Sequence, residues 1–504
     1  MLAVLLVTLP AGRLFAQGDS AGEAWMGLQA GVVAAIERAE PSVVSVARVV
    51  NAPPFAGPAG RLDPQSPGRA IEPGFVPTDF GSGVVIAKNP AGSERFVLTA
   101  AHVVLGGRDV DGNDTAAEAA GTQIVVRLES RHVLLAEIVA ADPRSDLAVL
   151  RLPLEAAGVP VDAAPPITIG NADDVRKGMF MVALGNPYAV ARDGSSSASL
   201  GMVSNISRRP APPGGQLLDT TESDVTIHHY GTLLHVDTRL DLGTSGGALV
   251  NLKGELVGMT IALAALEGYE KSVGYAIPID TEARKIIDSL LNGFEVEYGF
   301  LGVHPSAADG DALRPYRRWT AQASAARIRR IAPGSPADRC GLEENDIVLA
   351  VNGAAVYDDI DLIREIGWLG PDVDATLTVL RPGERRVLTT QCRLGKWPVY
   401  DDSLLVTSAD RHPSWRGLKI DYATARRRYL PTNVLEQFPQ GVLVTGLEAE
   451  SPAAKSGLVS GDLIVRADGV DVTTPREFRS VIDAAVGDVP LTLRDGRTVT
   501  IRTP

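Results

Sequence analysis

The chain has 504 residues, of which 45% are hydrophobic and 22% charged, a composition typical of globular proteins rather than disordered or fibrous ones. This length exceeds what one compact core uses and suggests about three domains. The formal net charge of −13 argues against nucleic acid as the main partner, because phosphate recognition needs a basic surface. The basic run at 426–428 is typical of a solvated helix face.

The first residues contain an apolar run over 2–9, far shorter than the roughly 20 residues that cross a bilayer. The run resembles the apolar part of a signal peptide, with Ala16 before the cleavage point. We therefore expect residues 1–16 to be a signal peptide and the protein to be periplasmic or otherwise exported, or membrane-anchored if the segment is retained. A terminal strand or helix packed in the core is the alternative.

Residues 17–293 contain short apolar runs bounded by turn residues, which predict a mainly β domain. Among these runs are "PSVVSVARVV", "RFVLTA", "MFMVALG" and "GELVGMTIAL". A Pro- and Gly-rich stretch over about 52–77 predicts a long surface loop within this domain. The segment "DTEARKIIDSLL" has helical spacing and ends at Asn292-Gly293, where we place a domain boundary.

Two later segments are similar to each other, at residues 331–356 and 447–472, and corresponding positions lie 116 residues apart. Both contain Ser-Pro-Ala, Gly-Leu, an apolar strand and a closing Asn-Gly or Asp-Gly turn. The repeat predicts two tandem domains, over about 296–398 and 414–504, and each resembles a PDZ domain. The alternative is a pair of purely structural β domains.

The PDZ resemblance implies binding of extended hydrophobic C-terminal peptides by strand addition, with a backbone loop receiving the terminal carboxylate. In the first copy "YGFLGV" resembles that loop, which gives the candidate residues Gly299, Phe300, Leu301 and Gly302. In the second copy "WRGLKI" over 415–420 occupies the same place with a poorer match.

The two cysteines, Cys340 and Cys392, are too few for a disulfide scaffold and lack metal-site spacing. Two buried free thiols are the favoured interpretation, and a single bridge is the alternative in an oxidising compartment. The histidines at 228, 229 and 235 show no metal-ligand pattern. We expect neither a metal nor another cofactor.

The stretch "DLGTSGGALVN" places Ser245 between glycines and matches G-x-S-x-G, the serine motif of α/β-hydrolases. That fold needs a helix after the serine and a histidine later in the same domain. Here a predicted hairpin follows, so an esterase of that class is disfavoured. The order His102 in "VLTAAHVV", Asp146 in "RSDLAVLRL" and then Ser245 instead predicts a trypsin-like catalytic triad.

Each residue type suits this chemistry. Ser245 would attack the substrate carbonyl, His102 would take its proton, and Asp146 would hold the imidazole. The N–H groups of Gly243 and Ser245 would form the oxyanion hole. Taken singly, each residue also has a purely structural interpretation: His102 as a core histidine, Asp146 as a capping aspartate and Ser245 as a hairpin serine. Their joint order favours the triad.

With "GSGVVI", "LGNPY", "GYAIP" and the paired PDZ segments added, the chain resembles the HtrA family of trypsin-like serine proteases, in its DegP-like form, from about residue 28 onward. The resemblance implies a chymotrypsin-like double β-barrel, with His102 and Asp146 in the first barrel and Ser245 in the second. It also implies an ATP-independent periplasmic protease for unfolded or damaged proteins, assembled from trimers. Trp25 is the candidate trimer contact, and the loop at 52–77 lies where relatives carry a regulatory loop.

The family's substrate-pocket positions fall on Leu240, Leu263 and Ala264, an aliphatic set that favours cleavage after small or medium apolar side chains. If Arg239 pointed inward, an acidic side chain would be preferred instead. Thr244 replaces the family's usual asparagine, and we expect no mechanistic role for its side chain. The function predicted is an exported serine endopeptidase, and the alternative is a peptide-binding chaperone or holdase with an idle triad.

Overall fold

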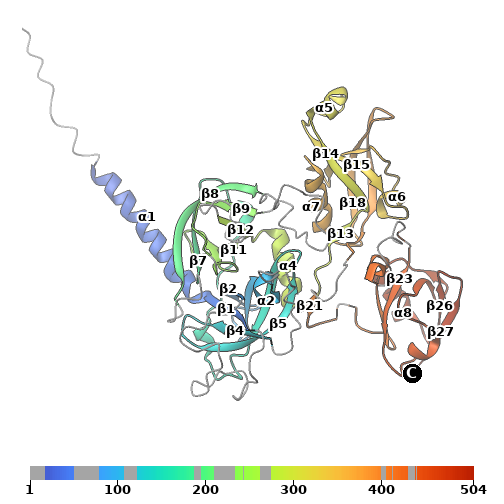
Figure 1. Cartoon of the computed structure of the whole chain (residues 1–504), viewed down its shortest axis with the longest axis horizontal. Helices are drawn as coiled ribbons and strands as arrows, with labels where there is room; N and C mark the ends of the chain where they lie inside the picture. Colours follow the sequence, from blue (N-terminus) through green and yellow to red (C-terminus); the bar gives the residue numbers. More distant parts are fainter. Residues whose placement is uncertain are drawn as a thin grey trace, which may run out of the picture.

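The computed structural model describes residues 18–49, 79–106, 122–186, 195–208, 233–241, 243–261, 274–398, 405–410, 412–428, 438 and 440–503. The chain forms two β-barrels followed by two small sheet units (Figure 1). This confirms the mainly β fold. The expected signal peptide and the predicted loop over 52–77 lie outside the described residues.

Helix α1 (Gly18–Ala39) precedes the first barrel and was not predicted. Figure 1 shows its N-terminal part extending away from the barrels. Among the side chains of α1 that the structure describes, Ala35 and Ala39 near its C-terminal end are fully buried, whereas Trp25 is 71% exposed. No helix in the described part of the chain is long and apolar enough to cross a membrane.

The first barrel is built from six antiparallel strands whose inward side chains form its core. The strands are β1 (Val43–Val49), β2 (Asp79–Ile86), β3 (Arg95–Ala100), β4 (Gln123–Arg127), β5 (Val133–Asp142) and β6 (Leu147–Leu152). Their order is β5-β4-β1-β2-β3-β6, and pairing of β5 with β6 closes the barrel. A strand from far along the chain, β21 (Val406–Thr407), extends this sheet beyond β5.

The second barrel is closed by six strands in the order β10-β11-β12-β9-β8-β7. They are β7 (Phe180–Gly185), β8 (Ser197–Arg208), β9 (Leu233–Val236), β10 (Ala248–Val250), β11 (Leu256–Ile261) and β12 (Gly274–Pro278). The predicted hairpin after Ser245 is confirmed as β10 and β11. The predicted helix is confirmed as α4 (Thr281–Leu291), which Asp280 caps by accepting from the Ala283 N–H.

The first small unit has the sheet order β14-β15-β16-β18-β19, and the second has the matching order β22-β23-β24-β26-β27. The first contains β13 (Gly299–Phe300), β14 (Val303–Ala308), α5 (Gly310–Leu313), β15 (Ala325–Ile331), α6 (Pro336–Arg339), β16 (Ile347–Val351), β17 (Ala354–Ala355), α7 (Asp359–Leu369), β18 (Asp374–Arg381), β19 (Arg386–Arg393) and β20 (Gly395–Lys396). The second contains β22 (Leu418–Tyr422), β23 (Val442–Leu447), β24 (Leu463–Ala467), β25 (Val470–Asp471), α8 (Pro475–Ala484), β26 (Val489–Leu493) and β27 (Thr498–Ile501). The shared order confirms the repeat, and it leaves β14 and β22 as edge strands of their sheets.

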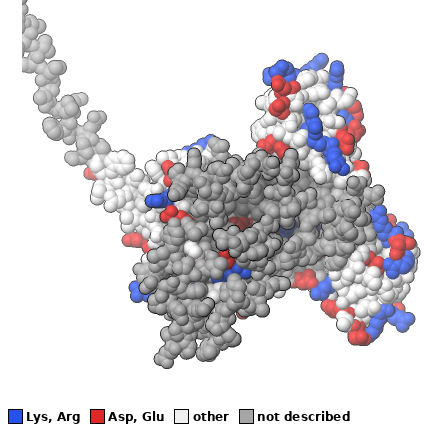
Figure 2. Space-filling model, in the orientation of Figure 1, with Lys and Arg blue, Asp and Glu red and all other residues white. Residues whose placement is uncertain are grey.

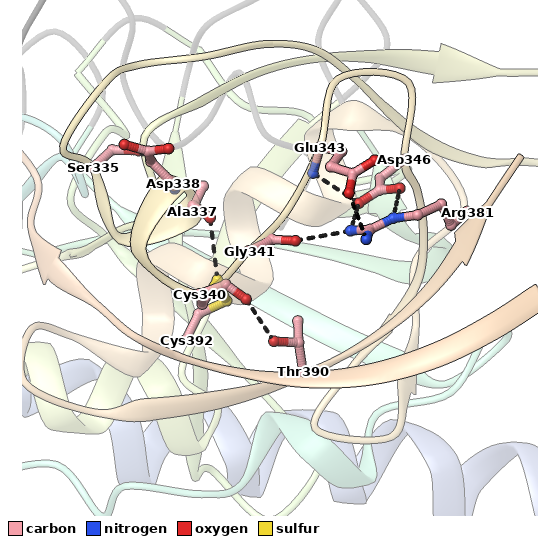
Figure 3. Close-up of a disulfide and its surroundings, with 10 residues drawn as sticks. All are labelled: Ser335, Ala337, Asp338, Cys340, Gly341, Glu343, Asp346, Arg381, Thr390 and Cys392. Atoms are coloured by element: carbon pink, nitrogen blue, oxygen red, sulfur yellow. Dashed lines mark hydrogen bonds and ion pairs between the residues drawn. A yellow bond between two sulfur atoms is a disulfide. The ribbon is translucent and has the colours of Figure 1, made fainter. Parts of the chain in front are cut away.

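Cys340 and Cys392 form a disulfide within the first small unit (Figure 3). The preference for two free thiols is therefore wrong. Cys340 ends α6 and Cys392 lies on β19, and packing of this helix against this strand brings their Cα atoms to 5.2 Å, within the range that a disulfide spans. Sequence separation gives no sign of this proximity.

A buried lysine joins the units. Lys396 at the end of β20 is 2% exposed, and its Nζ lies 2.8 Å from Glu295, 3.4 Å from Glu297 and 3.2 Å from Asp421 of the second small unit. Burial lowers the pKa of Lys396, but the three carboxylates outweigh it and the net pKa is raised.

Elsewhere, the face in Figure 2 shows Lys and Arg interspersed with Asp and Glu over both small units.

Candidate active site

Asp146 and His102 are brought together at the start of a short helix, α2 (Ala101–Leu105). The His102 Nδ1 lies 2.9 Å from Asp146 Oδ1 and 2.8 Å from Oδ2. The backbone N–H of His102 also donates to Oδ1, and the N–H of Ala101 donates to the Asp146 carbonyl. Both the ring and the backbone of the histidine are therefore held by one aspartate.

The turn that presents Asp146 is itself held by Asp142. One Asp142 oxygen accepts from the Ser145 N–H and the other from Arg144 Nε. Asp146 has a φ of 53°, in the left-handed region that aspartate tolerates better than most residues. The bonds to Asp142 and to α2 stabilise this conformation.

The pKa of His102 is raised above its ordinary value near 6.5. Burial acts to lower this pKa, but the charge of Asp146 and its hydrogen bond to the ring act more strongly in the other direction. Asp79 adds a smaller raising effect. The imidazolium that forms when the ring accepts a proton is thus stabilised by its surroundings.

The Ser245 loop belongs to the second barrel and packs against the first. A Cβ placed on Gly81 of β2 would lie 2.7 Å from the Ser245 carbonyl oxygen and 2.6 Å from Val103, the neighbour of His102. Gly81 therefore lies between the histidine helix and the serine loop. The structure brings all three predicted triad residues to the junction of the two barrels.

Glycines allow the loop to turn there. Gly243 and Gly246 have φ values of 93° and 85°, which residues with a Cβ rarely adopt. A Cβ on Gly246 would also lie 2.2 Å from the Ser82 carbonyl oxygen. Ser245 itself is 5% exposed.

Two hydroxyl residues outside the motif hold this loop, and the sequence analysis did not find them. Ser82 Oγ donates to the Gly243 carbonyl at 2.8 Å, and the Ser82 N–H donates to the Ser245 carbonyl at 2.8 Å. Thr260 Oγ1 donates to the Thr244 carbonyl at 2.6 Å. The only available signal was Ser82 within "GSGVVI", a motif that we used for the resemblance but not for the site.

Thr244 also has a structural role that we did not expect. Its Oγ1 donates to the Asp241 carbonyl at 2.7 Å, and its N–H donates to the same oxygen at 3.1 Å. The side chain thereby closes the turn that leads into Ser245.

The predicted substrate pocket is only partly visible. Leu240 is half-buried against the core of the second barrel, close to Gly274, whereas Leu263 and Ala264 lie outside the described residues. The side chain of Arg239 is 81% exposed and lies 3.8 Å from Asp241. The arginine side chain is therefore directed toward solvent, which argues against the acidic preference.

The loop "YGFLGV" connects the barrels to the first small unit. Tyr298 is 5% exposed and its hydroxyl donates to Asp142 at 2.5 Å. Gly299 and Phe300 form β13, which pairs with β20. Leu301 enters the core of the unit.

Both repeats build this loop in the same way. Gly302 has a φ of 84°, and a Cβ there would lie 2.2 Å from Ser335 Cβ; Gly417 has a φ of 81°, and its Cβ would lie 2.1 Å from Ser451 Cβ. In each copy the backbone N–H directly after the second strand that follows, Ala332 after β15 or Glu448 after β23, donates to the carbonyl of this glycine. The second loop thus has the backbone form of the first despite its poorer sequence match.

Of the three clustered histidines, only His235 is described, and its ring stacks on Tyr275 at 5.6 Å. A different group of possible ligands, Glu297, His412 and Asp421, lies within 4.8 Å of one another. The ammonium group of Lys396 lies against both of these carboxylates, so a lysine supplies positive charge at this place.

Comparison with known proteins agrees with the geometry. The trypsin-like peptidase domain model matches residues 81–259, and the PDZ domain model matches residues 327–381 and 443–494. The solved structure "HtrA-type protease AlgW with decapeptide" has the same fold, with a TM-score of 0.50 and 24% identity, over 73% of this chain and 99% of that chain. Fold and site together define a trypsin-like serine endopeptidase that carries two PDZ domains.

Relatives make the assignment more specific. "Probable periplasmic serine endoprotease DegP-like" from Halomonas elongata is 30% identical over 430 residues, 84% of this chain and 76% of the relative. A protein of the same name from Brucella melitensis is 27% identical over 507 residues, 96% of this chain and 90% of the relative. The chain belongs to the DegP-like family of serine endoproteases. Its substrates are proteins or peptides, and the peptidase interpretation is supported over the chaperone alternative.

Proposed function

We propose that Ser245 is the nucleophile, His102 the general base and Asp146 the orienting carboxylate of this endopeptidase. The observation that carries the proposal is the pair of short contacts from His102 Nδ1 to Asp146, beside a serine loop held against the same barrel. With Nδ1–H bonded to the carboxylate, the other ring nitrogen is the one that accepts a proton.

The reaction would proceed through an acyl-enzyme. Ser245 Oγ attacks the peptide carbonyl as His102 takes its proton, and the tetrahedral intermediate collapses when His102 protonates the leaving amine. Water, deprotonated by the same histidine, then attacks the acyl carbonyl, and the histidine returns the proton to Ser245 Oγ as the bond to the acyl group breaks. The N–H groups of Gly243 and Ser245 would stabilise the oxyanion in both halves.

The substrates that fit are unfolded or damaged proteins cut after small or medium apolar residues. In this proposal Leu240 contributes an aliphatic wall, and Arg239, whose side chain is 81% exposed, does not form the pocket floor. Such a pocket favours side chains such as Val or Ala, because a buried charge would lack a partner there.

The PDZ domains would capture hydrophobic C-terminal peptides by adding a strand along the edge strand β14, with Gly299–Gly302 receiving the carboxylate. The hydrogen bond from Tyr298 to Asp142 connects this loop to the turn that presents Asp146. Peptide binding could reach the active site through this bond by shifting the population toward the competent conformation.

Export to the periplasm fits the names of the relatives and the apolar N-terminal run. A homo-oligomer, a trimer or a multiple of trimers, fits the exposed Trp25 on the projecting helix α1.

Digestion tests the proposal. The wild type and Ser245→Ala are incubated with a denatured, disulfide-free protein, with and without a hydrophobic C-terminal peptide, and the new ends are mapped by mass spectrometry. We expect cleavage after Val and Ala by the wild type alone. Equal cleavage by both proteins would overturn the assignment of Ser245, and cuts mainly after Asp or Glu would overturn the aliphatic pocket.

A further inference from the structure

The carbonyl groups of residues 243–245, which form the nucleophile loop, accept hydrogen bonds in turn from two residues outside the loop. Ser82 donates through Oγ to Gly243 and through its N–H to Ser245. Thr260 donates through Oγ1 to Thr244, the carbonyl between them. Ser82 is on β2 of the first barrel and Thr260 is on β11 of the second, so each barrel supplies one hydroxyl.

Because the peptide bond is planar, a hydrogen bond that holds a carbonyl group in this loop also fixes the direction of the N–H group that follows it. In a planar trans peptide the C=O of one residue and the N–H of the next point in opposite directions. Thr260 holds the Thr244 carbonyl, and the N–H of Ser245 is thereby directed to the opposite side of the loop. The Gly247 N–H, which donates to the same carbonyl at 2.9 Å, supports this orientation.

The neighbouring peptide groups are held at both ends. Between Gly243 and Thr244, the carbonyl accepts from Ser82 Oγ and the N–H donates to Asp241. After Ser245, its carbonyl accepts from the Ser82 N–H and the N–H of Gly246 donates to the Thr260 carbonyl at 2.8 Å. A loop with glycines at positive φ would otherwise reach many conformations.

We propose that the Thr260 hydroxyl is a positioning group that directs the N–H of Ser245 at the oxyanion, and that the Ser82 hydroxyl supports it by holding the adjoining Gly243–Thr244 peptide group. This rests on the proposed function of Ser245. Neither hydroxyl touches the substrate; each acts through a backbone carbonyl. Both residues are buried, at 0% and 1% exposure, so the low-dielectric surroundings strengthen these hydrogen bonds.

The test uses the full chain, a fluorogenic peptide amide with Val before the scissile bond, and a peptide boronic acid that forms a tetrahedral adduct with the nucleophile. Five variants are compared with the wild type: Ser245→Ala, Ser82→Ala, Thr260→Val, Thr260→Ser, which keeps the hydroxyl, and Ser45→Ala. Ser45 is a buried serine directly opposite Ser82 on β1, and the nucleophile loop makes no hydrogen bond to it among those the structure describes.

We expect kcat to fall about 10- to 100-fold in Ser82→Ala and Thr260→Val, less than the roughly 10²–10³ for losing an oxyanion donor. KM should stay within about twofold, because the interaction improves only in the transition state. Boronate affinity should fall in parallel with kcat, and Thr260→Ser should recover most of the loss. Ser45→Ala should resemble the wild type.

The contrary results are distinct. If Ser82→Ala and Thr260→Val keep wild-type kcat and boronate affinity while Ser245→Ala is inactive, the positioning role is wrong and the nucleophile stands. If Thr260→Ser is as impaired as Thr260→Val, the hydroxyl is not the acting group. If Ser245→Ala is itself fully active, the proposed function fails. Circular-dichroism melting of every variant identifies misfolding, in which case the Thr260→Ser and Thr260→Val pair decides.

Discussion

Asp146 acts on His102 in three ways. It binds the ring, binds the histidine backbone, and supplies the charge that raises the pKa of the imidazole. One carboxylate thus fixes the tautomer, the orientation and the basicity of the proposed base.

The pH profile of kcat/KM should reflect this arrangement. A general base must be neutral, so activity should fall as pH drops through the raised pKa of His102, with the acid limb above 6.5. Asp146→Asn removes the main raising cause, so the limb should move to lower pH while the rate at pH 8 falls about 10³–10⁴-fold. Asp79→Asn removes only a minor cause and should shift the limb less. An unmoved limb in Asp146→Asn would contradict the pairing.

The sequence predicted the triad residues because their order and flanking apolar runs are local features. It did not predict Ser82 or Thr260 as loop anchors, because a hydroxyl that bonds a carbonyl 161 or 16 residues away along the chain leaves no pattern in its neighbours. Residue types that carry chemistry therefore allow a prediction from the sequence, whereas residues that hold a loop through long-range packing do not.

The secondary-structure elements also divide into those that the sequence predicts and those that it does not. The alternation of apolar residues predicted the hairpin of β10 and β11, and the spacing of "DTEARKIIDSLL" predicted α4. The strand β21 could not be predicted, because two residues show no hydrophobic pattern. Its partner β5 belongs to the first barrel, which lies far earlier in the chain. The disulfide likewise depends on how α6 packs on β19, which the two sequence positions do not reveal.

The units of the molecule are joined by contacts that meet around the first PDZ domain. Tyr298 bonds the first barrel, and Lys396 bonds Asp421 of the second PDZ domain. In the loop proposed to bind peptides, the ring centroid of Phe300 lies 4.9 Å from that of Phe438. The loop proposed to bind peptides is thus in contact with both neighbouring units.

Removing the buried lysine should loosen this arrangement. Lys396→Met leaves the carboxylates of Glu295, Glu297 and Asp421 without their shared cation, which should cost about 3–5 kcal/mol because breaking one side of a buried ion pair leaves the rest uncompensated. Hydrogen exchange should accelerate in β13, β20 and β22. Lys419→Met, at an exposed lysine on β22, is the matched control. Equal exchange in the two variants would show that the cluster does not hold the units.

Covalent labelling of the purified full-length protein with a fluorophosphonate, mapped by mass spectrometry, tests the assignment of the nucleophile. The reagent reacts with serines whose hydroxyl is activated by a neighbouring base. We expect the label on the peptide that contains Ser245, with labelling lost in His102→Ala and strongly reduced in Asp146→Asn. A label on another serine, or labelling of Ser245 that persists at the wild-type rate without His102, would contradict the catalytic triad.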